Sequence, residues 1–205
     1  MFATRMPSED ELVLAEQKNV ELEFHPFARD AFVFIANRHN PVRNLSTQQI
    51  KDIFAGKITK WKQLGGYNGT VKPLVRDRNS GSEELMRNLV MKNVSIKNNF
   101  QFQLIGSMSG IFDVLESDLE GIGYSILYYD RSMVCNPNTR TILVNGIEPT
   151  PQTVADGTYP FLYECVAVVR KDGPEKAKTV ALWLTSEEGS QVIRESGYIP
   201  RSATP

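Results

Sequence analysis

The residues best suited to chemistry lie in one short stretch, VRDRNSGSEELM. Arg76 precedes the run Ser80-Gly81-Ser82 by four residues, and a helical pattern starts at that run. A guanidinium fork, two hydroxyls and the free N–H groups of a helix N-terminus suit an oxyanion such as phosphate, sulfate or a carboxylate. A simpler interpretation is that Ser80 only caps the helix, with Glu83 completing a capping box. The stretch alone leaves both interpretations open.

Motifs for covalent catalysis and metal binding are absent from the sequence. Ser80 stands in NSGSE rather than in a Gly-x-Ser-x-Gly elbow, and no motif links it to His25 or His39. Cys135 and Cys165 are the only cysteines, and they lack the spacing of a zinc site. We therefore expect no enzyme activity, no metal and no cofactor. Two free thiols are favoured for the cysteines, and a single disulfide between them is the alternative.

The composition is that of an ordinary globular protein. The chain has 205 residues, of which 41% are hydrophobic and 23% charged, with a formal net charge of -1. Interspersed charges of both signs argue against nucleic acid or an anionic membrane as the main partner. Residues 1–20 are acidic and show no signal peptide. We therefore expect a cytoplasmic protein or a chain that lacks its natural start.

Helical and strand patterns alternate along the chain, which is typical of the α/β class. Two continuous apolar runs, at 31–36 and 161–170, predict buried central strands. Ser8 and Ser46 have the sequence features of helix N-caps, and Gly197 is placed to end the last helix. Further strands are expected at 20–24, 71–75, 102–105, 121–127 and 141–144, and helices at 8–18, 48–54, 82–92, 109–116, 174–184 and 187–195.

Several blocks of sequence, taken in order, resemble the phosphate-type solute-binding proteins of ABC transporters. The resemblance covers essentially the whole chain, and its most specific parts are NPVRNLSTQQIKDIFAGKITKWKQLGG and TSEEGSQVIRESGYIP. It implies a two-lobe α/β fold of the periplasmic-binding-protein-like type (type II), whose lobes close on an anion. The lobes it implies are an inserted lobe at 36–162 and an outer lobe at 1–35 and 163–205.

The same resemblance implies a role for the stretch VRDRNSGSEELM. By the family's motif, Arg76, Ser80, Gly81 and Ser82 are the anion-binding residues of the inserted lobe. Arg76 would give a bidentate fork, and the serine hydroxyls and helix N–H groups would supply further donors. Inorganic phosphate is the leading ligand implied.

Thr4 and Arg5 match the opposing turn of the outer lobe in this family. The best-known phosphate-specific members carry an aspartate where Arg5 stands, and that carboxylate accepts the proton of HPO4²⁻. Arginine is a donor only, so Arg5 would favour any dianion and weaken discrimination against sulfate. Arg5 as an ordinary surface charge is the alternative.

Function and partners follow from the resemblance as expectations. They are a substrate-binding component of an ABC-type phosphate uptake system, a permease partner and an extracytoplasmic location for the full-length form. The alternative is a ligand-sensing or interaction domain on the same fold, without a transport role.

The resemblance also implies that the outer lobe is incomplete at its start. The family has roughly a further βαβα segment before the position of Phe2. We therefore expect apolar positions such as Val20, Leu22 and Phe24 to lack neighbours. The outer lobe should then self-associate or be poorly ordered, while the inserted lobe stays compact. A chain that no longer binds an anion is a further possibility.

Overall fold

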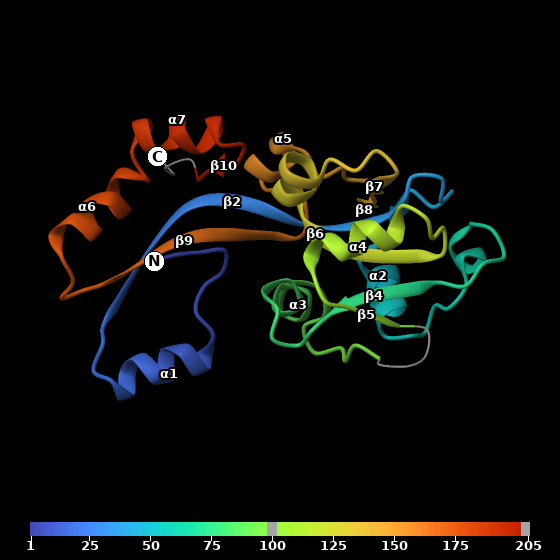
Figure 1. The fold of residues 1–205 in the computed structure, drawn as a ribbon, viewed down its shortest axis with the longest axis horizontal. Coiled ribbons are helices and arrows are strands. Elements are labelled where there is room, and N and C mark those ends of the chain that lie inside the picture. Colours follow the sequence, from blue (N-terminus) through green and yellow to red (C-terminus); the bar gives the residue numbers. More distant parts are fainter. Residues whose placement is uncertain (98–101, 202–205) are drawn as a thin grey trace. The chain divides into compact units, whose positions relative to one another are not determined.

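The computed structural model describes residues 1–97 and 102–201, and these form two compact units (Figure 1). Unit 1 contains Met1–Asp30, Val154–Asp156 and the described residues from Leu162 onward. Unit 2 contains the described residues of Ala31–Thr153 together with Gly157–Phe161. The lobe boundaries expected from the sequence were after residue 35 and before residue 163. In the structure the unit changes after Asp30 and before Leu162.

The sheet of unit 2 is built on the second half of β2 (Leu22–Asn37). There β2 pairs antiparallel with β6 (Gly121–Ile126), and β7 (Thr139–Thr141) pairs with its last residues. β6 pairs parallel with β4 (Lys72–Arg76), and β4 pairs parallel with β5 (Gln103–Ile105). Parallel neighbours need crossover connections, which here contain α3 (Gly81–Leu85) and α4 (Met108–Leu115).

Smaller elements complete the core of unit 2 and its connection to unit 1. They are α2 (Thr47–Phe54), a 3₁₀ turn at Trp61–Leu64, π-helical turns at Met86–Met91 and Tyr129–Val134, the parallel pair β3 (Asn44–Leu45) and β8 (Leu143–Val144), and α5 (Pro151–Ala155), whose end belongs to unit 1.

Aromatic rings form the centre of the unit 2 core. Phe32, Phe34, Phe54 and Tyr124 are fully buried, and their ring centroids lie 5.3 to 5.9 Å apart in successive contacts. Burial of one such apolar side chain contributes about 1.5–3 kcal/mol. α4 packs closely on β6, since a Cβ at Gly123 would lie 2.5 Å from Ile111 Cγ2. Unit 2 therefore gives β4 and the start of α3 a rigid support.

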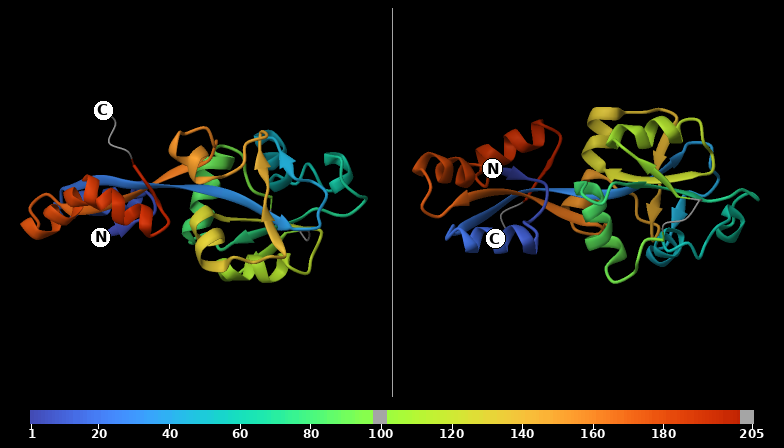
Figure 2. Two further views of the ribbon diagram at one scale, coloured as in Figure 1. Left: turned by 90° about the horizontal axis from the view of Figure 1, so that it is seen from above. Right: turned by 60° about the horizontal axis from the view of Figure 1, so that its bottom comes forward.

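Unit 1 has a smaller sheet. β1 (Phe2–Ala3) pairs antiparallel with β9 (Leu162–Arg170), and β9 pairs with β2, beside which it runs in both views of Figure 2. β10 (Ile199–Pro200) pairs with the middle of β2. The helices are α1 (Glu9–Gln17), α6 (Glu175–Trp183) and α7 (Glu187–Glu195). Ala167, Val169 and Ala181 form a buried cluster there, with Phe27 and Leu184 packed against it.

The predicted helix ends are confirmed. Ser8 and Ser46 each cap a helix with a full capping box, formed with Glu11 and Gln49 respectively. Gly197 follows the end of α7 with φ at +93°, which is the left-handed conformation expected for a glycine after a helix.

Four predicted elements differ in the structure. The separate strands at 20–24 and 31–36 are one strand, β2, because β10 continues the ladder at Ala28 and Arg29, and Tyr163 satisfies the buried Asp30. The helix expected at 82–92 changes to a π-helical turn after Leu85. The strand expected at 141–144 is divided, because β7 pairs with β2 and β8 pairs with β3.

None of the helices within the described ranges has the length and hydropathy needed to cross a bilayer.

Candidate functional site

The four residues predicted for the inserted lobe come together in unit 2, where β4 ends and α3 begins. Arg76 is the last residue of β4, Ser80 is the N-cap of α3, and Gly81 and Ser82 open its first turn. A crossover helix begins beside the carboxyl end of the strand it follows, and this edge is where α/β proteins bind ligands. The first N–H groups of a helix have no acceptor within it, so this end carries positive potential.

Ser80 is confirmed as the cap of α3. Its Oγ accepts a hydrogen bond from the Glu83 N–H at 3.3 Å, and its own N–H donates to the Asp77 carbonyl at 2.9 Å. The expected capping box is wrong, because the Glu83 carboxylate bonds to Tyr124 and Arg87 instead of returning to Ser80. The Ser80 N–H is already used by Asp77, so the helix start is closed without Glu83.

Arg76 is held at two points and keeps further donors. Its backbone N–H donates to the Tyr124 hydroxyl at 2.8 Å, and its Nη1 donates to the Ile105 carbonyl at 3.3 Å. Its Nε is buried and has no hydrogen-bond partner among the described residues. A buried, unpaired donor on a charged group is costly, so this atom is well suited to an incoming anion.

Gly81 and Ser82 differ in exposure. Gly81 is exposed, and a Cβ added there would meet no atom within 4 Å, so packing within the chain does not require glycine. Ser82 is buried, with 8% of its surface exposed. The first turn of α3 is therefore anchored by Ser82 and open at Gly81.

A buried polar network lies beneath this helix start, and no sequence pattern indicates it. The Tyr124 hydroxyl donates to the carboxylate of Glu83, which is only 2% exposed. Arg87 Nε donates to the other carboxylate oxygen at 3.2 Å. Burial, followed by the charge of Glu83, raises the pKa of the Tyr124 phenol. The contact joins residues 41 positions apart, beyond the reach of any local sequence pattern.

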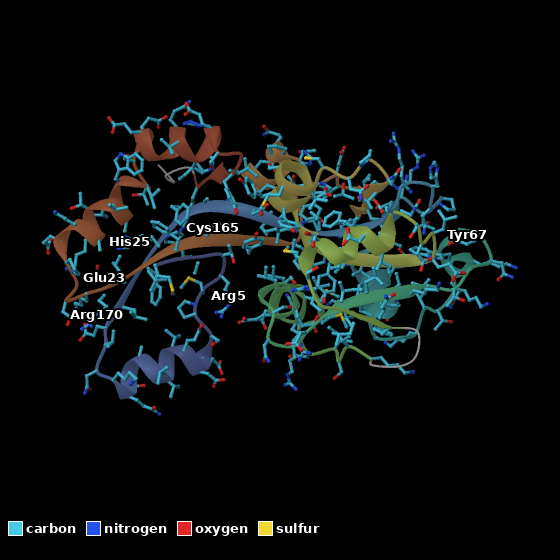
Figure 3. All side chains as sticks on the ribbon, viewed as in Figure 1. Arg5, Glu23, His25, Tyr67, Cys165 and Arg170 are labelled. Atoms are coloured by element: carbon cyan, nitrogen blue, oxygen red, sulfur yellow. The ribbon has the colours of Figure 1, made fainter. Side chains whose placement is uncertain are left out.

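Thr4 and Arg5 lie in unit 1, in the turn between β1 and α1, where Figure 3 labels Arg5. Arg5 Nη1 donates to Glu11 Oε2 at 2.8 Å, and Nη2 donates to Glu11 Oε1 at 3.2 Å. This pairing holds the pKa of the Glu11 carboxyl at about 2, mainly through the Arg5 hydrogen bond and then through the Ser8 N–H. Arg5 thus already holds a carboxylate with its fork, within its own unit.

Unit 1 also contains a cavity of about 730 Å³. It is bounded by β1, the turn with Thr4 and Arg5, the start of α1, the end of β9 and the start of α6. Most of the side chains in its wall are apolar. Thr4 and Arg5 are among the polar residues in its wall.

The cysteines are free, which confirms the favoured expectation. Cys135 is exposed and its thiol donates to the Arg131 carbonyl, whereas Cys165 is buried on β9. Burial, together with Asp30, raises the pKa of the Cys165 thiol to about 12. Within residues 1–97 and 102–201, no group of three His, Cys, Asp or Glu side chains could hold a metal ion.

Comparison with known proteins extends the sequence resemblance. The phosphate-binding protein PstS of Borreliella burgdorferi is 24% identical over 179 residues, which are 84% of this chain and 64% of that protein. PstS of Pseudomonas aeruginosa is 29% identical over 201 residues, covering 87% of this chain and 60% of that protein. A crystal structure from Clostridium perfringens, assigned to the phosphate ABC transporter substrate-binding proteins and containing phosphate, has a TM-score of 0.77 at 26% identity.

The coverage of these relatives is partial. The match to the Clostridium perfringens structure covers 97% of this chain and 77% of that one. The chain spans less than two thirds of the length of the curated relatives it matches. The expected α/β fold of the periplasmic-binding-protein type is nevertheless confirmed, since a family model described as a PBP superfamily domain matches residues 1–188. The chain therefore belongs to the PBP superfamily.

Proposed function

We propose that this chain binds an oxyanion, with inorganic phosphate as the first candidate, at the junction of β4 and α3. The observation that carries the proposal is Arg76, whose buried Nε lacks a partner among the described residues and stands next to a helix N-terminus. The guanidinium fork and the N–H groups of Gly81 and Ser82 can donate to several oxygens of one anion. The hydroxyl of Ser82, a residue that is 8% exposed, adds a further donor.

The relatives support binding rather than catalysis. Two are named phosphate-binding proteins, and the Clostridium perfringens structure contains phosphate. We extend the proposal to a role as the substrate-binding component of an ABC-type phosphate uptake system. That role implies a permease partner and an extracytoplasmic location.

Thr4 and Arg5 are proposed as the anion contacts contributed by unit 1. Arg5 is hydrogen-bonded to Glu11. To contact an anion, Arg5 must divide its N–H groups between the anion and the Glu11 carboxylate or release the carboxylate. Because arginine only donates, Arg5 itself offers no acceptor for the proton of HPO4²⁻. Arg5→Asp should supply one, and the preference for phosphate over sulfate should then rise in competition assays near neutral pH.

We also propose that copies of this chain associate with one another through unit 1. This rests on its exposed apolar side chains, which include Phe2, Leu12 and Leu182.

Calorimetric titration with phosphate and with sulfate tests the binding proposal directly. Arg76→Lys should weaken phosphate binding by about 1.5–3 kcal/mol, because a point ammonium cannot replace the planar fork. Arg78→Lys is the matched control, since Arg78 is exposed two residues away and should leave affinity unchanged.

Two results would count against the proposal. Absence of phosphate binding by the parent chain would reject phosphate as its ligand. Equal affinities of the parent and Arg76→Lys would remove Arg76 from the site.

A further inference from the structure

The Tyr124 hydroxyl lies below the candidate site and is hydrogen-bonded to both sides of it. It accepts from the backbone N–H of Arg76 at 2.8 Å and donates to the carboxylate of Glu83. Arg76 ends β4, and Glu83 lies in the first turn of α3. A single phenol therefore ties the end of the strand to the start of the helix, across the base of the loop that joins them.

The partners of this phenol are themselves fixed. Tyr124 is fully buried on β6, where its ring packs against Phe32 and Phe54 with centroids 5.3 and 5.8 Å away. Glu83 donates its N–H to Ser80 Oγ and receives Arg87 Nε on its carboxylate. A buried carboxylate that lost either donor would be destabilised, so the arrangement strongly resists rearrangement.

We infer that Tyr124, anchored by Glu83, is a positioning residue that sets Arg76 relative to the N–H groups of Gly81 and Ser82. The inference rests on the proposed function, because it concerns the same anion site. Binding of one anion by a fork and by a helix N-terminus requires the two to keep a fixed separation. Arg76 and the helix start lie at opposite ends of a loop whose intervening residues Asp77, Arg78 and Asn79 are exposed. The loop has local hydrogen bonds from the Asn79 and Ser80 N–H groups to Asp77, and the phenol adds a buried link from the strand end to the helix.

The positioning is assigned to the hydrogen bond between Glu83 and Tyr124 and not to the charge of Glu83. Glutamine keeps one carbonyl oxygen for the Tyr124 hydroxyl, places its amide NH2 where the second carboxylate oxygen accepted from the partly exposed Arg87, and removes one negative charge from below an anion site. Phenylalanine at position 124 keeps the ring packing and removes both hydrogen bonds. These two substitutions therefore separate the hydrogen-bonded link from the charge.

Two measurements on the 205-residue chain test the inference: phosphate affinity by calorimetry, and hydrogen exchange of the assigned Arg76 amide. Tyr124→Phe should lower phosphate affinity about tenfold and speed Arg76 exchange by a similar factor, because the amide loses its acceptor. Glu83→Gln should keep the slow Arg76 exchange, with affinity within about threefold of the parent or tighter.

Tyr159→Phe is the matched control. Tyr159 is also buried in unit 2, but its hydroxyl donates to the Phe32 carbonyl rather than to the β4–α3 segment. It loses one buried hydroxyl and should change neither the Arg76 exchange nor the phosphate affinity.

The possible outcomes are distinct. Faster Arg76 exchange with unchanged affinity in Tyr124→Phe would overturn the inference, since the link would then be structural only. Unchanged exchange would overturn it as well, as would an equal loss of affinity in Tyr159→Phe. If the parent chain binds no phosphate, the proposed function fails, and the inferred role in anion binding falls with it. The Arg76 exchange would then report only on the Tyr124 link.

Discussion

Unit 2 buries its large apolar side chains around a cluster of aromatic rings, whereas unit 1 exposes many of its own. Among the described residues, ten large hydrophobic side chains are exposed in unit 1 and four in unit 2. The ten are Met1, Phe2, Met6, Leu12, Val13, Leu14, Val180, Leu182, Trp183 and Val192. α1 has no buried residue at all. The smaller unit thus has the larger share of unburied apolar surface.

This difference bears on how firmly the proposed binding groups are held. Arg76 and Ser80 rest on β4 and α3, which pack on a continuous core. Thr4 and Arg5 rest on a turn between a two-residue strand and a helix without buried residues. Groups on well-packed elements open locally less often. The contrast predicts that affinity depends mainly on unit 2 and that the contribution of unit 1 is easily changed.

The largest expected effect comes from the unit 2 core. Phe34 is fully buried and its ring contacts Phe32, Phe54 and Phe161. Phe34→Ala should lower the free energy of unfolding of unit 2 by about 3–5 kcal/mol, because it leaves a cavity.

Denaturant titration followed by Trp61 fluorescence, in a Trp183→Phe background, measures unit 2, since the chain has two tryptophans and Trp61 is buried there. Val192→Ala, at an exposed position in unit 1, should change stability by less than about 0.5 kcal/mol. Similar losses in both variants would remove the contrast between the units.

A second effect should be confined to unit 1. A Cβ at Gly189 would lie 2.1 Å from the Trp183 carbonyl oxygen and 2.7 Å from Leu184 Cα, both of which are backbone atoms. Gly189→Ala should therefore force α6 and α7 apart and lower the free energy of unfolding of unit 1 by about 1–3 kcal/mol. Trp183 fluorescence should report the change while Trp61 does not. Gly106→Ala, whose Cβ would meet nothing within 4 Å, should change the fluorescence of neither tryptophan.

A third effect concerns association. Leu12 and Leu14 on α1 are 43% and 51% exposed. Replacing both with Gln should weaken self-association of the chain by about tenfold or more, as measured by light scattering over a dilution series. The same change at Leu104 and Leu119 of unit 2 should have little effect. A parent chain that remains monomeric at every concentration would contradict the proposed association.

The smallest effect is one of pH. The pKa of Glu11 is depressed from 4.5 to about 2, so its contribution to the start of α1 is fully present above pH 4.5. That contribution is lost as pH falls through about 2. Its size is small, because the Glu11 side chain is 52% exposed and solvent screens the pair. NMR signals of α1 should show this transition, and Glu11→Gln should abolish it.

Much of the fold could be predicted from local pattern. The capping boxes at Ser8 and Ser46 and the glycine at 197 are local signals, and the structure places helix ends at each. The continuity of β2 could not be predicted in this way. Its middle contains Pro26, Arg29 and Asp30, which break the apolar pattern, and what keeps it a strand is pairing with segments far along the chain.

The candidate site shows the same division. Arg76 and the Ser80 cap follow from residue type and spacing, because a strand end and a helix start are local features. The Glu83–Tyr124 bond and the Arg5–Glu11 pair could not be predicted from such local features. The first joins helix α3 to strand β6, 41 positions apart in the chain. In the second, Arg5 precedes the helix, outside the spacing at which helical side chains meet.

The path of β2 and β9 also sets an order of synthesis. β2 ends at Asn37 and β9 begins at Leu162, so every strand of unit 2 leaves the ribosome before unit 1 receives its second long strand. Unit 2 can therefore fold on the nascent chain, and its folding brings the ends of the intervening chain together, which reduces the loop-closure entropy for unit 1. Until then β1 lacks its pairing partner β9. The exposed apolar side chains of β1 and α1 form the segment where we expect a chaperone to bind during synthesis.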